Sequence, residues 1–200
     1  MRTLEIRRHT YTKQSPARGR GSHLSQKGVE LARFIGSAIG PFEYVAASQV
    51  PRTLETAIAM GFAVDDLLNL GGELWEAAQA EFAHRQWRDD PQLYAGYHAV
   101  MRTNGAVAAL GRRQVQLWES LLTHVQDGGQ GLLISHGGLI EPGLVAALPD
   151  CQHERWGRGF RHGEGVRLRH DGTRFFDADI LFLDEDRVSH PETTDRSHAG

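Results

Sequence analysis

Basic and imidazole side chains stand next to each other at Arg8-His9, and a second histidine, His136, follows an apolar stretch. Imidazole nitrogens act as nucleophiles and proton carriers near neutral pH, and guanidinium groups bind the oxygens of phosphates and carboxylates. Another guanidinium, that of Arg52, follows Pro51 at a predicted helix start. Because buried cations without anionic partners are costly, these residues predict a site for an anionic ligand.

Short apolar segments, typical of buried strands, precede these groups. They cover residues 3–8, 44–48 and 131–135, and the first two end at Arg8 and Ser48. In open parallel sheets, ligands bind beside the carboxyl ends of the strands, and helix N-termini favour anions. If the three strands are neighbours, two histidines and two arginines converge on one anion site.

The rest of the chain alternates between helical and extended patterns. Helices are predicted over residues 24–40, 51–61, 91–101, 106–126 and 139–148, with a further helical pattern after the Gly-Gly turn in 67–87. Two strands joined by a tight turn are predicted over 165–170 and 173–183. The alternation predicts an α/β fold, a three-layer αβα sandwich whose mostly parallel central sheet has helices on both faces and a C-terminal hairpin. We expect one domain over residues 1–183 and a polar, flexible tail over 184–200.

Composition narrows the possible partners. The chain has 200 residues and a net charge of −3, so it has no overall basic excess for binding nucleic acid. The single Cys151 excludes an internal disulfide and a multi-cysteine metal site. No apolar run approaches the roughly 18 residues of a membrane span, and we see no signal-peptide core at the N-terminus. We therefore expect a cytoplasmic protein, monomeric or homodimeric, with neither nucleic acid nor membrane as a partner.

Four motifs in this order resemble those of the histidine phosphatase superfamily, the phosphoglycerate-mutase-like family. They are Arg8-His9-Thr10, Leu24-Ser25-Gln26-Lys27-Gly28, the set Ser48, Arg52, Thr56 and Ala57, and LLISHGGLI over residues 132–140. The resemblance spans residues 4–140. It implies a metal-independent phosphomonoester hydrolase that needs no cofactor and acts on a small phosphorylated metabolite.

The resemblance also implies catalytic roles. His9 would be the nucleophile that forms a phosphohistidine, which water then hydrolyses. Arg8, Arg52 and His136 would hold the phosphoryl oxygens and stabilise the charge of the transition state. These roles agree with the physics of phosphoryl transfer, which depends mainly on positioning and charge neutralisation. Since cationic and donor groups can supply what Mg²⁺ supplies elsewhere, no metal site is expected.

A carboxylic acid is expected to protonate the leaving oxygen. The resemblance places it after the second arginine, where Glu73 and Glu76 are the candidates and Glu81 is a more distant option. A helix N-terminus after the Gly-Gly turn could direct Glu73 inward, and Glu76 lies about one turn further along. The sequence leaves this choice open.

Substrate-binding groups are expected at Thr10, Lys13, Ser15 and Gly137. Thr10 departs from the family pattern, which has glycine there, and its hydroxyl could donate a hydrogen bond where glycine would allow a closer backbone approach. Further candidates for contact with the distal part of a substrate, or for the rim of the site, are Arg18, Arg20, His23 and His162.

Arg7 is expected to play no part in this site. Neighbouring residues of a strand point to opposite faces, so Arg7 faces away from Arg8 and can pair with Glu5.

Three other functions fit the same motifs. They are phosphoglycerate mutase activity, phosphohistidine protein phosphatase activity, and non-catalytic binding of a phosphorylated ligand. Family mutases are typically longer, and the phosphohistidine phosphatases are typically shorter and lack the acid. Thr10 and the unassigned acid favour the binding module. Residues 10–23 and 73–105, where substrate identity would be determined, contain no recognisable code.

Overall fold

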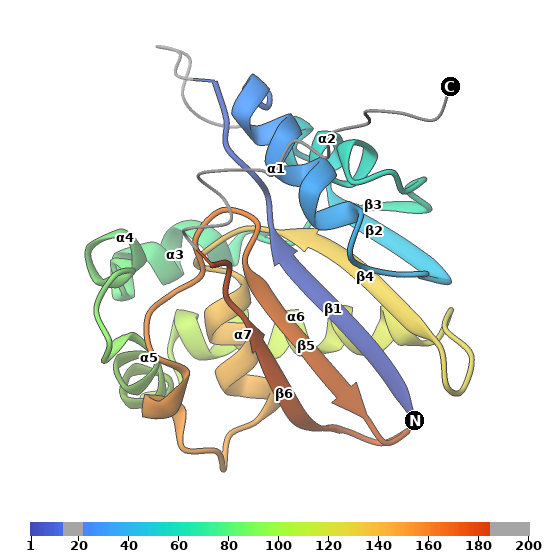
Figure 1. Cartoon of the computed structure of the whole chain (residues 1–200). Coiled ribbons are helices and arrows are strands. Elements are labelled where there is room, and N and C mark those ends of the chain that lie inside the picture. Colours follow the sequence, from blue (N-terminus) through green and yellow to red (C-terminus); the bar gives the residue numbers. More distant parts are fainter. Residues whose placement is uncertain (14–21, 185–200) are drawn as a thin grey trace, which may run out of the picture.

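A single six-stranded sheet lies at the centre of the computed structural model, which describes residues 1–13 and 22–184 (Figure 1). The strand order is β3-β2-β4-β1-β5-β6. The strands are β1 (Arg2–Arg8), β2 (Tyr44–Ser48), β3 (Asp66–Leu68), β4 (Gln130–Ser135), β5 (Gly165–His170) and β6 (Phe175–Leu181). β3, β2, β4 and β1 run parallel, and the β5–β6 hairpin adds antiparallel strands beside β1. The predicted mostly parallel α/β sheet is confirmed.

Helices fill most of the chain between the strands. They are α1 (Gln26–Gly36), α2 (Pro51–Ala59), α3 (Leu74–Glu81), α4 (His84–Trp87), α5 (Leu93–Met101), α6 (Ala106–Leu122), α7 (Ile140–Ala147) and the 3₁₀-helix η1 (His153–Trp156). Among the helices of residues 1–13 and 22–184, none is long and apolar enough to cross a membrane.

Strand alternation divides the apolar side chains between two cores, one on each face of the sheet. On one face, Val45, Ala47, Leu132 and Ile134 pack against α1 and α2. On the other face, Leu4, Ile6, Ala46 and Leu133 pack in a larger core with α5, α6 and α7. Figure 1 shows α1 and α2 on one side of the sheet and α6 and α7 on the other, which gives three layers.

β1 carries a buried ion cluster on the face opposite Leu4 and Ile6. The carboxylate of Glu5 is fully buried, and it accepts hydrogen bonds from Arg7 Nε at 2.5 Å and from Arg167 Nη2 at 2.6 Å. This contact confirms the predicted pairing of Arg7 with Glu5. Arg7 Nη1 also donates to the carbonyl of Gly163 at 2.8 Å, so the cluster ties β1 to the loop that precedes β5.

The segment between α2 and α6 differs most from the sequence-based expectation. β3 has three residues, too few for a recognisable strand period, and the sequence indicates only an apolar segment there. The helical pattern in 67–87 is divided into α3 and α4 by Phe82, whose backbone is extended. The helix predicted over 106–126 ends at Leu122. Apart from Asp184, the predicted tail lies outside the described residues.

Replacing Arg7 tests the ion cluster on β1. We expect Arg7→Ala to lower the free energy of unfolding by about 3 kcal/mol, because a buried carboxylate loses one of its two cationic partners. Arg2→Ala is the matched control on the same strand. Its ion pair with Asp127 lies at the surface, so we expect a loss below about 1 kcal/mol. Urea denaturation compares the two variants, and equal stabilities would contradict this account.

Candidate active site

The carboxyl ends of three neighbouring strands, β2, β4 and β1, form the base of one cavity. Arg8 is paired with Ser135 in the parallel register, and the His9 N–H donates to the Ser135 carbonyl at 3.0 Å. Arg52 lies in the first turn of α2, close after β2. The strand order therefore brings Arg8, His9, Arg52 and His136 together at the cavity wall, as predicted.

The cavity has a volume of about 840 Å³, which suits a small-molecule ligand. Beyond the four residues above, its polar and aromatic walls include Ser48, Gln49, Asn69, Glu73, Trp75, Gln79, His84, Arg88 and Gly137.

His9 is buried and held in one orientation. Its Nδ1 lies 2.8 Å from the Thr10 carbonyl, which can only accept, so Nδ1 carries the proton and Nε2 of the neutral ring has the lone pair. Burial lowers the pKa of His9 well below the usual imidazole value, and His136, Arg8 and Arg52 lower it further. The ring therefore presents a neutral nitrogen nucleophile to the cavity at neutral pH.

His136 connects Arg52 to the end of β2. Arg52 Nη2 can only donate, so the 3.3 Å contact with His136 Nδ1 places the ring proton on Nε2. That proton is donated to Ser48 Oγ at 2.7 Å. Burial lowers the pKa of His136 to about 3, with Arg52 and Arg8 adding to the effect. In this arrangement a neutral His136 orients Arg52 beside His9, whose ring centroid is 5.4 Å away.

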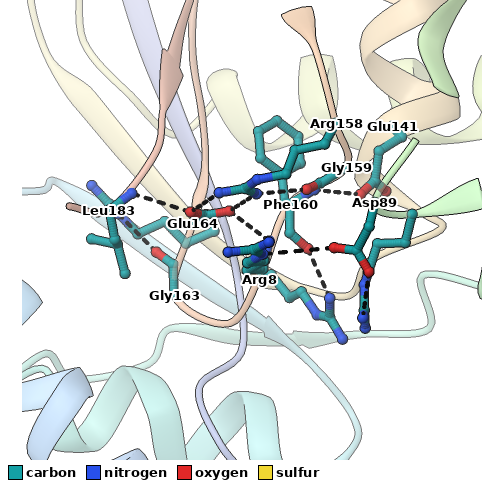
Figure 2. Close-up of polar contacts among 12 residues, drawn as sticks. Arg8, Asp89, Glu141, Arg158, Gly159, Phe160, Gly163, Glu164 and Leu183 are labelled. Carbon is teal, nitrogen blue, oxygen red and sulfur yellow. Dashed lines mark hydrogen bonds and ion pairs between the residues drawn. The ribbon is translucent and has the colours of Figure 1, made fainter. Parts of the chain in front are cut away.

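Arg8 is fixed by the loop between η1 and β5. Its Nη1 donates to the carbonyl of Phe160 at 2.7 Å. The N–H of Phe160 in turn donates to Glu141 Oε1 at 3.1 Å, and the N–H of Gly138 donates to Glu141 Oε2 at 2.6 Å. Burial lowers the pKa of Arg8, whereas the Glu141 carboxylate raises it, and a guanidinium keeps its charge in proteins. Figure 2 shows Glu141, Phe160 and Arg8 together in this network.

Glu164 fastens the same loop at its other end (Figure 2). Its carboxylate accepts from both terminal nitrogens of Arg158, at 2.6 and 2.8 Å, and from the backbone N–H of Arg161 and Leu183. Its carbonyl accepts from the N–H of Arg8 at 2.8 Å. The loop therefore holds Arg8 through both its backbone and its guanidinium.

The three carboxylates considered as the acid lie in different surroundings. Glu73, exposed at the N-cap of α3, lines the cavity, whereas Glu76 in the first turn of α3 is exposed and does not line it. Glu81 accepts from the N–H of Val107 at 3.0 Å and from Thr103 Oγ1 at 3.2 Å, so it caps the start of α6. Of the three, only Glu73 faces the cavity.

The predicted substrate-binding residues are divided between the cavity and other places. Gly137 lines the cavity. Thr10 is buried behind it, where the Thr10 N–H donates to Thr56 Oγ1 at 3.1 Å and the two hydroxyl oxygens lie 3.4 Å apart. Lys13 lies at a separate surface cavity beside α1 and α2. Ser15 lies outside the described residues, as do Arg18 and Arg20.

Two further histidines named from the sequence lie in different places. The His162 ring is 5.4 Å from the His9 ring, edge to face, and 4.8 Å from the Tyr11 ring. Burial lowers the pKa of His162 to about 3, and Arg8 is the strongest of the nearby cations that add to this. His23 instead forms an ion-pair contact with Glu55 beside the second cavity.

The family model of the histidine phosphatase superfamily (branch 1) matches residues 5–176. The chain belongs to the histidine phosphatase superfamily. No curated protein sequence matches it. Within residues 1–13 and 22–184, no group of three or more histidine, cysteine, aspartate or glutamate side chains has the arrangement of a metal site.

Several solved structures share the fold. Bacillus stearothermophilus YhfR is 22% identical, with a TM-score of 0.59 over 88% of this chain and 95% of that one. The mycobacterial glucosyl-3-phosphoglycerate phosphatase in complex with VO3 is 20% identical, with a TM-score of 0.61 over 90% and 98%. Phosphoglycerate mutase from Bacillus anthracis is 20% identical, with a TM-score of 0.56 over 94% and 95%. At these identities the likeness concerns the fold.

Several residues of this cavity cannot be predicted from the sequence. His84, Arg88 and Trp75 come from the segment between β3 and α5, where no strand end marks a position at the site. Glu141 was within a predicted helix, but nothing in its local pattern indicates the contact with Phe160. The one available signal is a carboxylate within an apolar helical segment. Such a group is buried, and a buried carboxylate requires hydrogen-bond donors from elsewhere in the chain.

The histidines around the cavity make the stability of this chain pH-dependent. The pKa of His162 is about 3 in the folded chain, against about 6.5 in an unfolded one. Between these values the unfolded state binds more protons, so the free energy of unfolding decreases as the pH falls from about 7 to about 4. We expect His162→Gln to reduce this slope by up to about 1.4 kcal/mol per pH unit.

Urea denaturation at several pH values measures both slopes. His124→Gln is the matched control, because His124 is exposed and stacks on Tyr44, away from the cavity. An unchanged slope in the His162 variant would show that this ring protonates freely in the folded state.

Proposed function

We propose that this chain is a metal-independent phosphomonoesterase that hydrolyses a small phosphorylated metabolite through a phosphohistidine at His9. The observation that carries the proposal is the fixed His9 ring. Its Nδ1–H is donated to the Thr10 carbonyl, and no described residue forms a hydrogen bond with Nε2. A neutral imidazole whose second nitrogen is held by the backbone is an oriented nucleophile.

Cationic groups beside the nucleophile support the same chemistry. Arg8 and Arg52 both line the cavity with His9, and a guanidinium can bind two phosphoryl oxygens at once. As Nε2 attacks phosphorus, negative charge on the phosphoryl oxygens is balanced by these fixed cations, so no metal ion is needed for that purpose. Water then attacks the phosphohistidine and releases inorganic phosphate.

Hydrolysis is the simplest reaction that this arrangement supports, because transfer to water requires no second substrate site. The proteins of similar fold include phosphatases and a phosphoglycerate mutase, which all act on phosphoryl groups. Transfer to a second hydroxyl group, as in a mutase, would appear as phosphorylated product in the same assays.

Hydrolysis of p-nitrophenyl phosphate tests the proposal. We expect the wild-type protein to turn over this substrate equally well with and without EDTA. His9→Ala is expected to lower kcat by at least about 10³-fold, because it removes the nucleophile. A brief reaction quenched in alkali is expected to contain acid-labile phosphate on the protein, and the variant should contain none.

His98→Ala provides the control, since His98 is an exposed histidine on α5 that does not line the cavity. It is expected to retain wild-type activity. A wild-type protein that binds inorganic phosphate but hydrolyses no member of a panel of phosphomonoesters would instead identify a binding module.

A further inference from the structure

The proposed hydrolysis needs a proton donor for the leaving oxygen, and the cavity contains two candidates. Among the described residues that line it, Glu73 is the one carboxylate. Its side chain is exposed, makes no cap hydrogen bond, and is held by no described partner. His84, in contrast, is 4% exposed and held on two sides. A general acid requires a fixed position and a proton to give, so the two residues differ in suitability.

His84 lies beside the phosphate-binding arginine. A Cβ atom built on Gly137 would be 3.3 Å from His84 Nε2 and 3.3 Å from Arg8 Nη1. The ring also packs on Gly138, where a Cβ would be 3.3 Å from His84 Cγ. The two glycines therefore leave room for the imidazole to reach the wall on which Arg8 lies. His84 and Arg8 line the same cavity, and the Nε2 atom itself is buried in its wall.

Glu141 supplies the charge that an imidazolium needs. Its fully buried carboxylate lies 3.9 Å from His84 Nε2, and it is itself fixed by the N–H groups of Gly138 and Phe160. Attraction between opposite charges is strong where water is excluded. Arg8 and Arg88, which line the same cavity, repel an imidazolium, and a bound phosphate dianion would offset that repulsion.

Tyr97 accommodates both protonation states of the ring. Its hydroxyl lies 3.0 Å from His84 Nδ1. The phenol oxygen can accept from Nδ1–H of the imidazolium, and Nδ1 keeps its proton when Nε2 gives up its own, so this hydrogen bond survives proton transfer. Burial raises the pKa of Tyr97 well above 10, and Glu141 raises it further, so the phenol stays protonated.

We propose that His84 is the general acid of this reaction, with Glu141 and Tyr97 as its positioning residues, an inference that rests on the proposed function. As His9 Nε2 forms its bond to phosphorus, the bond from phosphorus to the leaving oxygen breaks and its electron pair goes to that oxygen. The oxygen takes the proton from His84 Nε2. In the second step the neutral His84 takes a proton from the attacking water, so the proton count is restored.

A pair of aryl phosphates tests this role. Phenoxide is much more basic than p-nitrophenoxide and depends far more on a proton, although the two substrates have similar shapes. We expect His84→Gln to lower kcat/KM for phenyl phosphate by about 10²- to 10³-fold, and for p-nitrophenyl phosphate by only a few-fold. Glutamine can keep an N–H near the Nε2 position but cannot release its proton, so a role limited to phosphate binding would not give this selectivity.

Glu73→Gln is the competing variant. We expect it to change kcat/KM for both substrates equally and mildly. A loss selective for phenyl phosphate in Glu73→Gln, or an equal loss for both substrates in His84→Gln, would overturn the assignment of His84. An inert wild-type protein would overturn the proposed function itself.

A second variant keeps the test valid if the buried His84 substitution prevents folding. Tyr97→Phe keeps the aromatic volume and removes the hydroxyl that holds Nδ1. We expect a smaller loss with the same selectivity for phenyl phosphate, about three- to tenfold, because one hydrogen bond is removed. Equal kcat/KM losses on both substrates, or none, would contradict the proposed position of His84.

Discussion

The site depends on the hydrogen bonds that the buried carboxylate of Glu141 accepts from two separate loops. Glu141 lies at the start of α7, and it accepts hydrogen bonds from Gly138, which follows β4, and from Phe160, in the loop before β5. The Phe160 carbonyl then receives the Arg8 guanidinium. One group with no solvent contact thus fixes the turn after His136 and the loop that holds Arg8. Removing its charge would take away the carboxylate that most strongly offsets the charge of Arg8.

Strand β1 positions Arg8 through side chains on both of its faces. Even-numbered positions of β1 pack in the larger core, and Arg8 follows Leu4 and Ile6 on that side. Odd-numbered positions carry the Glu5–Arg7 pair, which joins the strand to Gly163 in the same loop. Both faces of β1 therefore hold the loop against the strand end. The position of Arg8 is set by the sheet, the loop and a buried charge together.

The sequence was sufficient to predict those parts of the site that depend on local patterns. Apolar segments ending in Arg8, Ser48 and Ser135 predict strand ends, and strand ends of a parallel sheet meet, so the grouping of His9, Arg52 and His136 follows. Contacts between distant segments have no such pattern. Glu141 and Phe160 meet only because α7 and the loop before β5 pack together.

The proposed proton donor, His84, likewise depends on tertiary contacts that the sequence does not reveal. Position along the chain favours the glutamates after the Gly-Gly turn, but the orientation of α3 is set by its packing on α6. His84 reaches the cavity because an extended residue, Phe82, ends α3 and a new short helix begins. The sequence shows a helical pattern across this break, so tertiary packing decides the outcome.

Charge explains why buried histidines suit this cavity. His9 and His136 lie near two guanidinium groups, and burial and these cations keep both rings neutral. A neutral His9 keeps its lone pair for attack, and a neutral His136 can accept from Arg52 while it donates to Ser48. Around these two rings the positive charge is thus carried by arginines, which cannot lose a proton to a phosphate dianion. A proton donor must then lie beside an anion of the protein, and Glu141 is the buried carboxylate that adjoins this wall of the cavity.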